Sequence, residues 1–265
     1  MPTAQVDGID LYHELHGEAT ASPLVFVNGI FQDTTAWSLH VRRFRGRFRC
    51  LVYDCRGQGR SARPPGPYRI ERHAADLLGL LDALGIRRPN IVGLSNGGAV
   101  AMTFAAAHPD RVRALVLVDT FARADGALRA KLRAWRAALD AGGPGLRFDV
   151  SVPWNFSAAF LEAHEPELAG LRERALAWDP DAMRALMAGS AEHDARAALS
   201  RITAPTLVLV GEQDVLAPPW MARDVAAAIQ GAQLRQIAGA GHAMPIEKAE
   251  EFCTVVRDFL ESTET

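Results

Sequence analysis

The sequence has few cysteines and no apolar run long enough to cross a bilayer. Cys50, Cys55 and Cys253 are the only cysteines, and their odd number and scattered spacing fit neither a disulfide framework nor a metal site. We interpret Cys55 as an ordinary free thiol, with a catalytic role as a remote alternative. The first ten residues lack the basic flank and apolar core of a signal peptide. These absences predict a cytoplasmic protein.

An excess of charge of one sign is also missing. The chain carries 29 Lys and Arg against 31 Asp and Glu, a formal net charge of -2, and the two signs are interspersed. This composition indicates neither a nucleic-acid partner nor a membrane surface. We therefore expect a small-molecule substrate as the partner, and a homo-oligomer stays open.

Short apolar runs alternate with helical patterns along most of the chain. Nearly continuous runs of this kind suit parallel strands that are covered on both faces, and an antiparallel hairpin joined at Asp7-Gly8 precedes them. The alternation predicts a doubly wound, mostly parallel eight-stranded α/β sheet. The expected strands cover Ala4–Val6, Leu11–Leu15, 24–27, 50–53, 90–94, 114–119, 206–211 and 232–237.

The alternation stops between about Phe121 and Leu199. This stretch is rich in Ala, Leu and Arg, shows no convincing strand, and is interrupted by "GGPG" at 142–145 and by single prolines. We predict a core in two parts, residues 1–121 and 200–265, with a helical cap inserted at residues 122–199.

Residues Gly93 to Gly97 match the pattern G-x-S-x-G, with Ser95 at its centre. A β-branched run precedes the pattern and small residues follow it, which is the context of a nucleophile elbow. Such a turn is strained and needs small neighbours, and Gly98 allows the next helix to approach the sheet. Ser95 is therefore the predicted nucleophile; the alternative is a glycine-rich turn with an incidental serine.

A serine needs a base, and the base needs an acid. His242 follows the last predicted strand in a loop that can reach Ser95, whereas the other seven histidines lie in the first hairpin, in helical segments or in the cap. Asp214, just past strand 206–211, completes the chain order Ser, Asp, His. Asp119 and, less strongly, Glu212 are the rival acids.

Together these motifs resemble the α/β-hydrolase family. "YDCRGQGRS" (53–61) and "AAAHPDRVRALVLVD" (105–119) also resemble segments of that family, so the likeness covers nearly the whole chain outside the cap. The chain looks similar to esterases, enol-lactonases and cofactor-free haloperoxidases. Haloalkane dehalogenases fit less well, because their nucleophile is an aspartate.

The resemblance also implies an oxyanion hole. The family carries one backbone donor just after a His-Gly pair; this chain has Asn28-Gly29, so the donor is Ile30, and the second donor is the N–H of Asn96. We predict that the Asn28 side-chain amide bonds to neighbouring loop backbone and holds the Ile30 N–H toward Ser95. Alternatively, Asn28-Gly29 is only a turn pair.

The resemblance and the three residues imply acyl transfer to water from an ester, lactone or thioester of a small, apolar or aromatic substrate, with no metal or organic cofactor. C–C bond hydrolysis or cofactor-free haloperoxidation by the same triad is the alternative, and a non-catalytic ligand receptor of this fold is another. No carboxylate-binding cluster stands out, and Arg123, Arg129 and Arg133 are best explained as a solvated face. Aromatic residues that are candidates for the pocket, although packing is the commoner role, are Phe31, Trp154, Phe156, Phe160 and Trp178.

Overall fold

The computed structural model describes residues 2–264 and contains one eight-stranded sheet with the strand order β1-β2-β4-β3-β5-β6-β7-β8. Strand β2 pairs antiparallel with β1 and with β4, and the remaining neighbours are parallel. The predicted doubly wound, mostly parallel sheet is confirmed. The strands are β1 (Thr3–Val6), β2 (Ile9–His16), β3 (Ser22–Val27), β4 (Phe48–Tyr53), β5 (Asn90–Leu94), β6 (Leu115–Val118), β7 (Thr206–Gly211) and β8 (Gln233–Ile237).

The first hairpin turns at the predicted pair. Asp7 has φ 47° and Gly8 has φ 79°, and two successive positive φ angles are the requirement of a type I′ turn. Val6 therefore pairs with Ile9, and β1 lies at the edge of the sheet.

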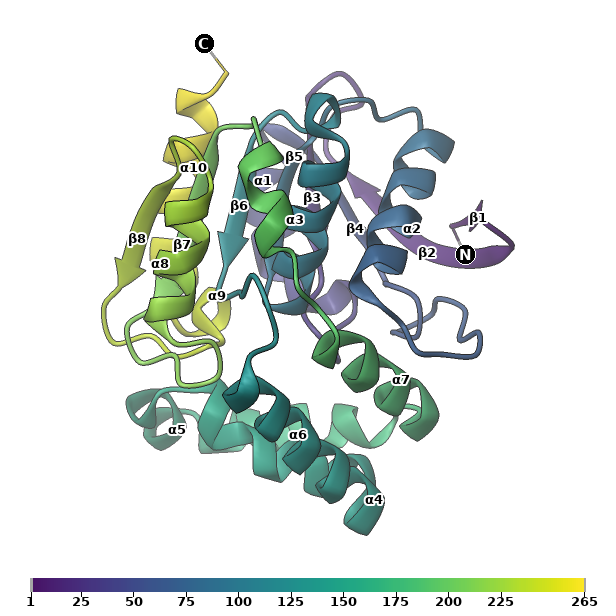
Figure 1. Ribbon diagram of the computed structural model, residues 1–265, viewed down its shortest axis with the longest axis vertical. Coiled ribbons are helices and arrows are strands. Elements are labelled where there is room, and N and C mark those ends of the chain that lie inside the picture. Colours follow the sequence, from purple (N-terminus) through teal and green to yellow (C-terminus); the bar gives the residue numbers. More distant parts are fainter. Residues whose placement is uncertain (1, 265) are drawn as a thin grey trace.

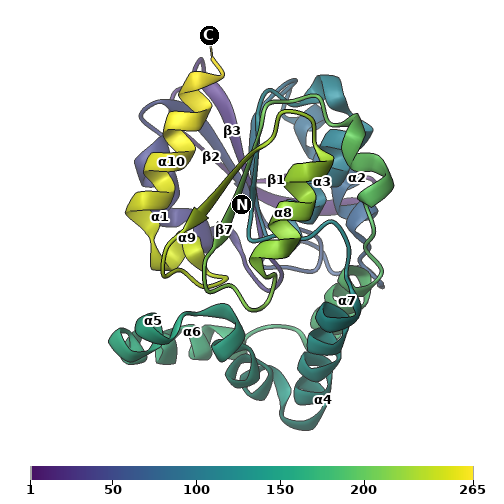
Figure 2. The ribbon, with the colours of Figure 1, turned by 60° about the vertical axis from the view of Figure 1, so that its left-hand side comes forward.

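Helices cover both faces of the sheet (Figure 2). Helices α1 (Ser38–Phe44) and α10 (Ala249–Ser262) lie on one face, and α2 (Ile70–Ala83), α3 (Asn96–Ala107) and α8 (Pro219–Ala228) lie on the other. Each face has its own buried apolar cluster. Burial on both sides explains the nearly continuous apolar strands of the sequence.

Four helices occupy the chain between β6 and β7 and lie together below the sheet in Figure 1. They are α4 (Gly126–Asn155), α5 (Ala158–Ala163), α6 (Glu165–Leu176) and α7 (Pro180–Ala191). Helix α4 is broken at Gly142 and Gly143, whose φ values are -147° and 71°. The short helix α9 (Met244–Glu247) follows β8. No helix within residues 2–264 has both the length and the apolar character of a membrane span.

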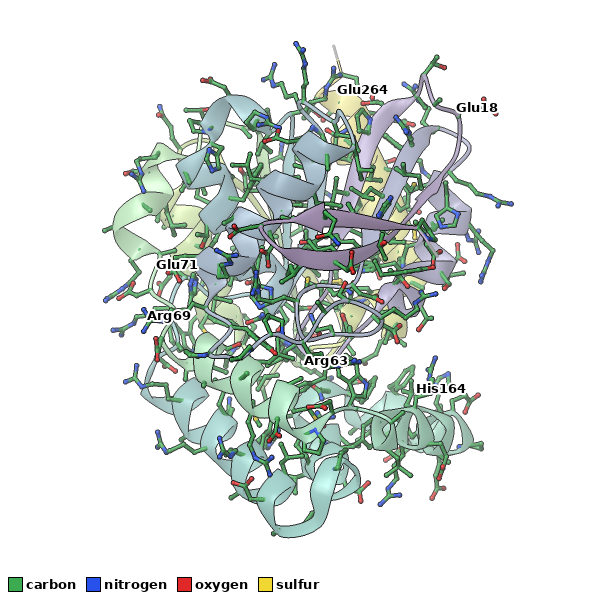
Figure 3. All side chains as sticks on the ribbon, turned by 90° about the vertical axis from the view of Figure 1, so that its right-hand side faces the viewer. Glu18, Arg63, Arg69, Glu71, His164 and Glu264 are labelled. Atoms are coloured by element: carbon green, nitrogen blue, oxygen red, sulfur yellow. The ribbon has the colours of Figure 1, made fainter. Side chains whose placement is uncertain are left out.

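Helix α7 contacts the connection between β4 and α2. The Tyr68 N–H donates to the Ala185 carbonyl at 3.1 Å, and Arg69 pairs with Glu192 at 2.9 Å. In Figure 3, Arg63 and Arg69 of this connection lie beside the cap helices, whereas Glu18 and Glu264 lie at the opposite end of the molecule. One side of the helical insertion is thereby attached to the core.

Candidate active site

Ser95 occupies a strained turn between β5 and α3. Its φ and ψ are 54° and -117°, a conformation that non-glycine residues rarely adopt. A Cβ atom on Gly97 would lie 2.2 Å from the Val27 carbonyl oxygen, and one on Gly93 would lie 2.4 Å from the Gly97 carbonyl oxygen. Side chains at either position would prevent this turn, so the glycines of the motif have a steric role.

The three predicted triad residues lie in hydrogen-bond contact. His242 Nε2 is 2.9 Å from Ser95 Oγ, and His242 Nδ1 is 2.8 Å from Asp214 Oδ2. The other oxygen of Asp214 accepts hydrogen bonds from the N–H groups of Leu216 and Ala217, both at 2.8 Å. All three side chains are less than a tenth exposed. The carboxylate is held so that it can orient the imidazole toward the serine.

Among the described residues, neither rival acid forms a hydrogen bond or an ion pair with His242. Asp119 lies at the end of β6 and accepts from the Gly211 N–H at 2.8 Å. Burial, reinforced by the charge of Asp214, raises the pKa of Asp119 well above its ordinary value, which favours its neutral form. Glu212 is exposed and accepts from the Gly239 N–H.

The Asn28 side chain braces the loop after β3. Its amide nitrogen donates to the Tyr53 carbonyl at 2.9 Å and, at the longer distance of 3.5 Å, to the Gln32 carbonyl within the loop. Its oxygen accepts from the Trp37 indole at 2.9 Å. The Gln32 side chain, which sequence reasoning missed, accepts from the Gly29 N–H at 2.9 Å. Asn28 is thus a brace for this loop, whereas the turn itself falls at Ile30 and Phe31 and not at the predicted pair Asn28-Gly29.

The Ile30 N–H makes no hydrogen bond to any described residue. The Asn96 N–H also lacks an intrahelical acceptor, because Asn96 begins α3. Phe31, next to Ile30, has φ 59°. Strain at a residue of this size is uncommon and concentrates at functional sites. Within residues 2–264, these two backbone N–H groups therefore have no protein acceptor.

A cavity of about 380 Å³ lies between the core and the cap, with Ser95 and His242 in its wall. This volume suits a small organic molecule. Three of the expected pocket residues line it, namely Phe31, Phe156 and Trp178.

Two of the expected residues do not line this cavity. Trp154 stacks on Trp135 with ring centroids 6.0 Å apart, and Phe160 stacks between Phe156 and His164. Lining residues that sequence reasoning missed include Trp135, Arg147, Phe148, Asn155 and Leu171. All come from the cap, where helical periodicity alone does not identify the face that borders a cavity.

The cap is attached to the loop that carries His242. The Ala243 N–H donates to the Asn155 carbonyl at 2.8 Å. The Ser157 hydroxyl donates to Glu247 at 2.5 Å, and the Ser157 N–H contacts the same carboxylate. These contacts attach the cap to the loop that carries His242.

A catalytic role of the Cys55 thiol finds no support in the structure. Cys55 is 2% exposed, and burial raises the pKa of its thiol to about 12, so the reactive thiolate is disfavoured. Within residues 2–264, no three His, Cys, Asp or Glu side chains gather closely enough to hold a metal ion.

Known proteins resemble this chain over almost its full length. A model of the alpha/beta hydrolase fold matches residues 22–249. A protein of Caulobacter sp. (strain K31) named "Putative carbamate hydrolase RutD" is 30% identical over 265 residues, with 98% of each chain covered. The crystal structure of the enol-lactonase from Burkholderia xenovorans LB400 superimposes with a TM-score of 0.93 at 33% identity, covering 98% of this chain and 100% of that one. A thermophilic esterase from Thermogutta terrifontis, solved with malate bound, gives a TM-score of 0.89 at 32% identity, covering 99% and 97%. These likenesses support a hydrolase of this fold.

Proposed function

The chain belongs to the alpha/beta hydrolase fold family, and from this premise we propose that it cleaves a carboxylic ester, lactone or thioester through an acyl-enzyme on Ser95. The observation that carries the proposal is the continuous hydrogen-bond chain from Ser95 through His242 to Asp214, with Ser95 and His242 in the wall of the cavity. A receptor without catalysis would have no need of this arrangement.

In the proposed mechanism, Ser95 Oγ attacks the carbonyl carbon while His242 Nε2 accepts the hydroxyl proton. Asp214 stabilises the imidazolium that forms. The resulting oxyanion accepts hydrogen bonds from the N–H groups of Ile30 and Asn96. Each such donor contributes roughly 3 kcal/mol of transition-state stabilisation.

Collapse of this intermediate breaks the bond to the leaving group, which takes the proton from His242. Water then attacks the acyl-enzyme, again with His242 as base, and a second collapse frees the acid and restores Ser95. Every proton transfer passes through His242, so the complete reaction cycle requires no further acid or base.

The substrate class follows from the cavity and from the relatives. Phe31, Phe156 and Trp178 supply apolar aromatic surface, which favours a small substrate with an apolar or aromatic part. The names carbamate hydrolase, enol-lactonase and esterase among the relatives support cleavage beside a carbonyl group. Carbamates therefore join esters, lactones and thioesters as substrates to be tested.

The test is a panel of these four compound classes with the wild type and the Ser95→Ala variant. We expect at least about a 10⁴-fold loss of turnover in Ser95→Ala. Ser38→Ala, an exposed serine at the start of α1, is the matched control and should keep its activity. A fluorophosphonate probe should label the wild type and fail to label Ser95→Ala.

Three outcomes would contradict the proposal. Full turnover by the Ser95→Ala variant would exclude Ser95 as the nucleophile. Folded wild type that resists the probe would favour the ligand receptor. Diketone cleavage or peracid-dependent halogenation that exceeds turnover of every member of the panel would favour the alternative chemistries.

A further inference from the structure

Two buried arginines in this chain have opposite surroundings. Arg56 and Arg147 are each 5% exposed. Arg56 donates two hydrogen bonds to Asp76, at 2.5 and 2.6 Å. Arg147 has no hydrogen bond or ion pair with any described residue, and its Nε is fully buried without an acceptor. A buried cation without a partner is costly, so its retention requires an explanation.

The surroundings of Arg147 hold the guanidinium in position without neutralising it. Its central carbon lies 4.4 Å from the centroid of the Phe31 ring and 6.0 Å from that of Trp135. Aromatic faces attract a cation but supply no hydrogen-bond acceptor. The guanidinium is therefore held in one orientation, and its N–H groups remain available to donate hydrogen bonds.

Arg147 lines the same cavity as Ser95 and His242. The other charged residues of this wall are Asp33 and Arg174. Asp33 caps the short helix Thr34–Trp37, accepting hydrogen bonds from the Thr35 N–H and hydroxyl at 2.8 and 2.5 Å. Arg174 is exposed.

Arg147 remains charged at neutral pH, although burial lowers its pKa to about 10. Asp33 accepts both of its hydrogen bonds at Oδ1. Because Arg174 is exposed, Arg147 is the one buried cation that the described residues of this wall present to a ligand.

We propose that Arg147 binds a carboxylate carried by the substrate, remote from the carbonyl that Ser95 attacks. The planar fork of a guanidinium matches the two oxygens of a carboxylate, and a desolvated pair of this kind discriminates strongly against neutral analogues. This inference rests on the proposed function: the substrate is an ester, lactone or related acyl compound that also bears a free acid.

The first test compares matched substrates with the wild type. One series contains 4-nitrophenyl half-esters of linear dicarboxylic acids from glutarate to suberate, each paired with its uncharged terminal amide. A second series contains acetyl esters of hydroxy acids and of their amides, which puts the carboxylate on the leaving-group side. In at least one series the acid should exceed its amide in kcat/KM by about 10- to 100-fold.

Variants assign that preference to Arg147. Arg147→Gln should reduce the acid-to-amide ratio of kcat/KM to near one, and Arg147→Lys should keep part of it, because the charge remains and the fork is lost. Arg133→Gln, the same substitution at an exposed position of α4, should leave the ratio at its wild-type value. Equal rates for acid and amide in both series would overturn the inference. So would an Arg147→Gln variant that lowers both members of each pair equally, which is the signature of a packing role.

A binding measurement separates this inference from the proposed chemistry. Calorimetry with the Ser95→Ala variant compares monomethyl adipate with methyl adipamate and requires no turnover. Tighter binding of the acid, lost in the Ser95→Ala, Arg147→Gln double variant, would support the role of Arg147 even if the wild type hydrolysed none of the esters. Equal affinities for the two compounds, alongside efficient hydrolysis by the wild type, would overturn the role of Arg147 and leave the hydrolase intact.

Discussion

The Trp37 indole donates a buried hydrogen bond of 2.9 Å to the side-chain oxygen of Asn28. The side-chain nitrogen of Asn28 donates to the Tyr53 carbonyl at the end of β4. One residue therefore joins the loop after β3 to the neighbouring strand and to the helical turn Thr34–Trp37. Ile30, the proposed oxyanion donor, lies two residues further along this loop.

Replacement of Asn28 by Ala should lower kcat more than it changes KM. The loop would lose both anchors, and the Ile30 N–H would no longer be held in one orientation. Because an oxyanion donor acts on the transition state rather than on the bound substrate, we expect kcat to fall by roughly 10- to 100-fold. The buried Trp37 N–H, left without an acceptor, should also lower the free energy of unfolding by about 1–3 kcal/mol.

Asn90→Ala is the matched control for this prediction. Asn90 is also a fully buried asparagine, but it begins β5 at the opposite end from Ser95. Its replacement should lower stability with little change in kcat. Steady-state kinetics and urea unfolding of the two variants provide the measurement. An Asn28→Ala variant that raises KM alone would argue that Asn28 shapes the pocket instead.

The two buried aspartates Asp214 and Asp119 should differ sharply in their effect on turnover. Asp214→Asn removes the carboxylate that orients the imidazole and should lower kcat by about 10⁴-fold. Asp119→Asn replaces a group whose neutral form is already favoured, so kcat should change by less than about 10-fold. Stopped or continuous ester assays on both variants test this contrast. Similar losses in the two variants would mean that Asp119 shares the role of the acid.

The hydrogen-bonded set of Ser95, His242 and Asp214 could be predicted from the sequence because its constraints are local. The strained turn at Ser95 admits only small neighbours, and that requirement leaves a readable pattern of glycines. Asp214 and His242 each follow a strand, and parallel strands bring their carboxyl ends to one edge. Chain order does not separate Asp214 from Asp119, because both lie between Ser95 and His242. The contact of Asp214 with His242 Nδ1 makes that distinction.

The walls of the cavity could not be predicted in the same way. Arg147 borders the cavity because α4 changes direction at Gly142 and Gly143. The sequence predicts that break, but it does not predict the new direction of the chain. Trp154 and Phe160 illustrate the same limit, since each stacks on another aromatic ring and neither lines the cavity. Packing between cap helices decides such faces, and a periodicity of 3.6 residues describes only one helix at a time.

The buried ion pair of Arg56 and Asp76 should be more important to stability than any exposed pair. Both side chains are at most 6% exposed, and the contact is bidentate. Asp76→Ala would leave the Arg56 charge buried and unpaired, at a cost of about 3–5 kcal/mol in the free energy of unfolding. The control is Asp140, which forms exposed ion pairs with Arg136 and Arg184. Asp140→Ala should lower stability far less than Asp76→Ala does, because solvent screens exposed pairs. Chemical denaturation of both variants provides the measurement, and equal costs would contradict the role of burial.

Acidification should destabilise the protein between about pH 6.5 and pH 4. Burial lowers the pKa of His40 and His193 to about 4 and that of His73 to about 3, from 6.5. In this window the unfolded chain binds up to three more protons at these residues than the folded chain does, so stability rises with pH. Asp54 and Asp119 act in the opposite direction, because their raised pKa values mean that unfolding releases protons there.

Unfolding therefore takes up a net of about one to two protons. The free energy of unfolding should then change by roughly 1–3 kcal/mol for each pH unit. Urea unfolding at fixed ionic strength between pH 5 and pH 6.5 measures this slope. His193→Asn should reduce the net uptake of protons on unfolding by about one, because one of the three buried imidazoles is then absent. The slope should fall accordingly. A slope of zero in the wild type, or greater stability on acidification, would show that the buried histidines do not control the response to acid.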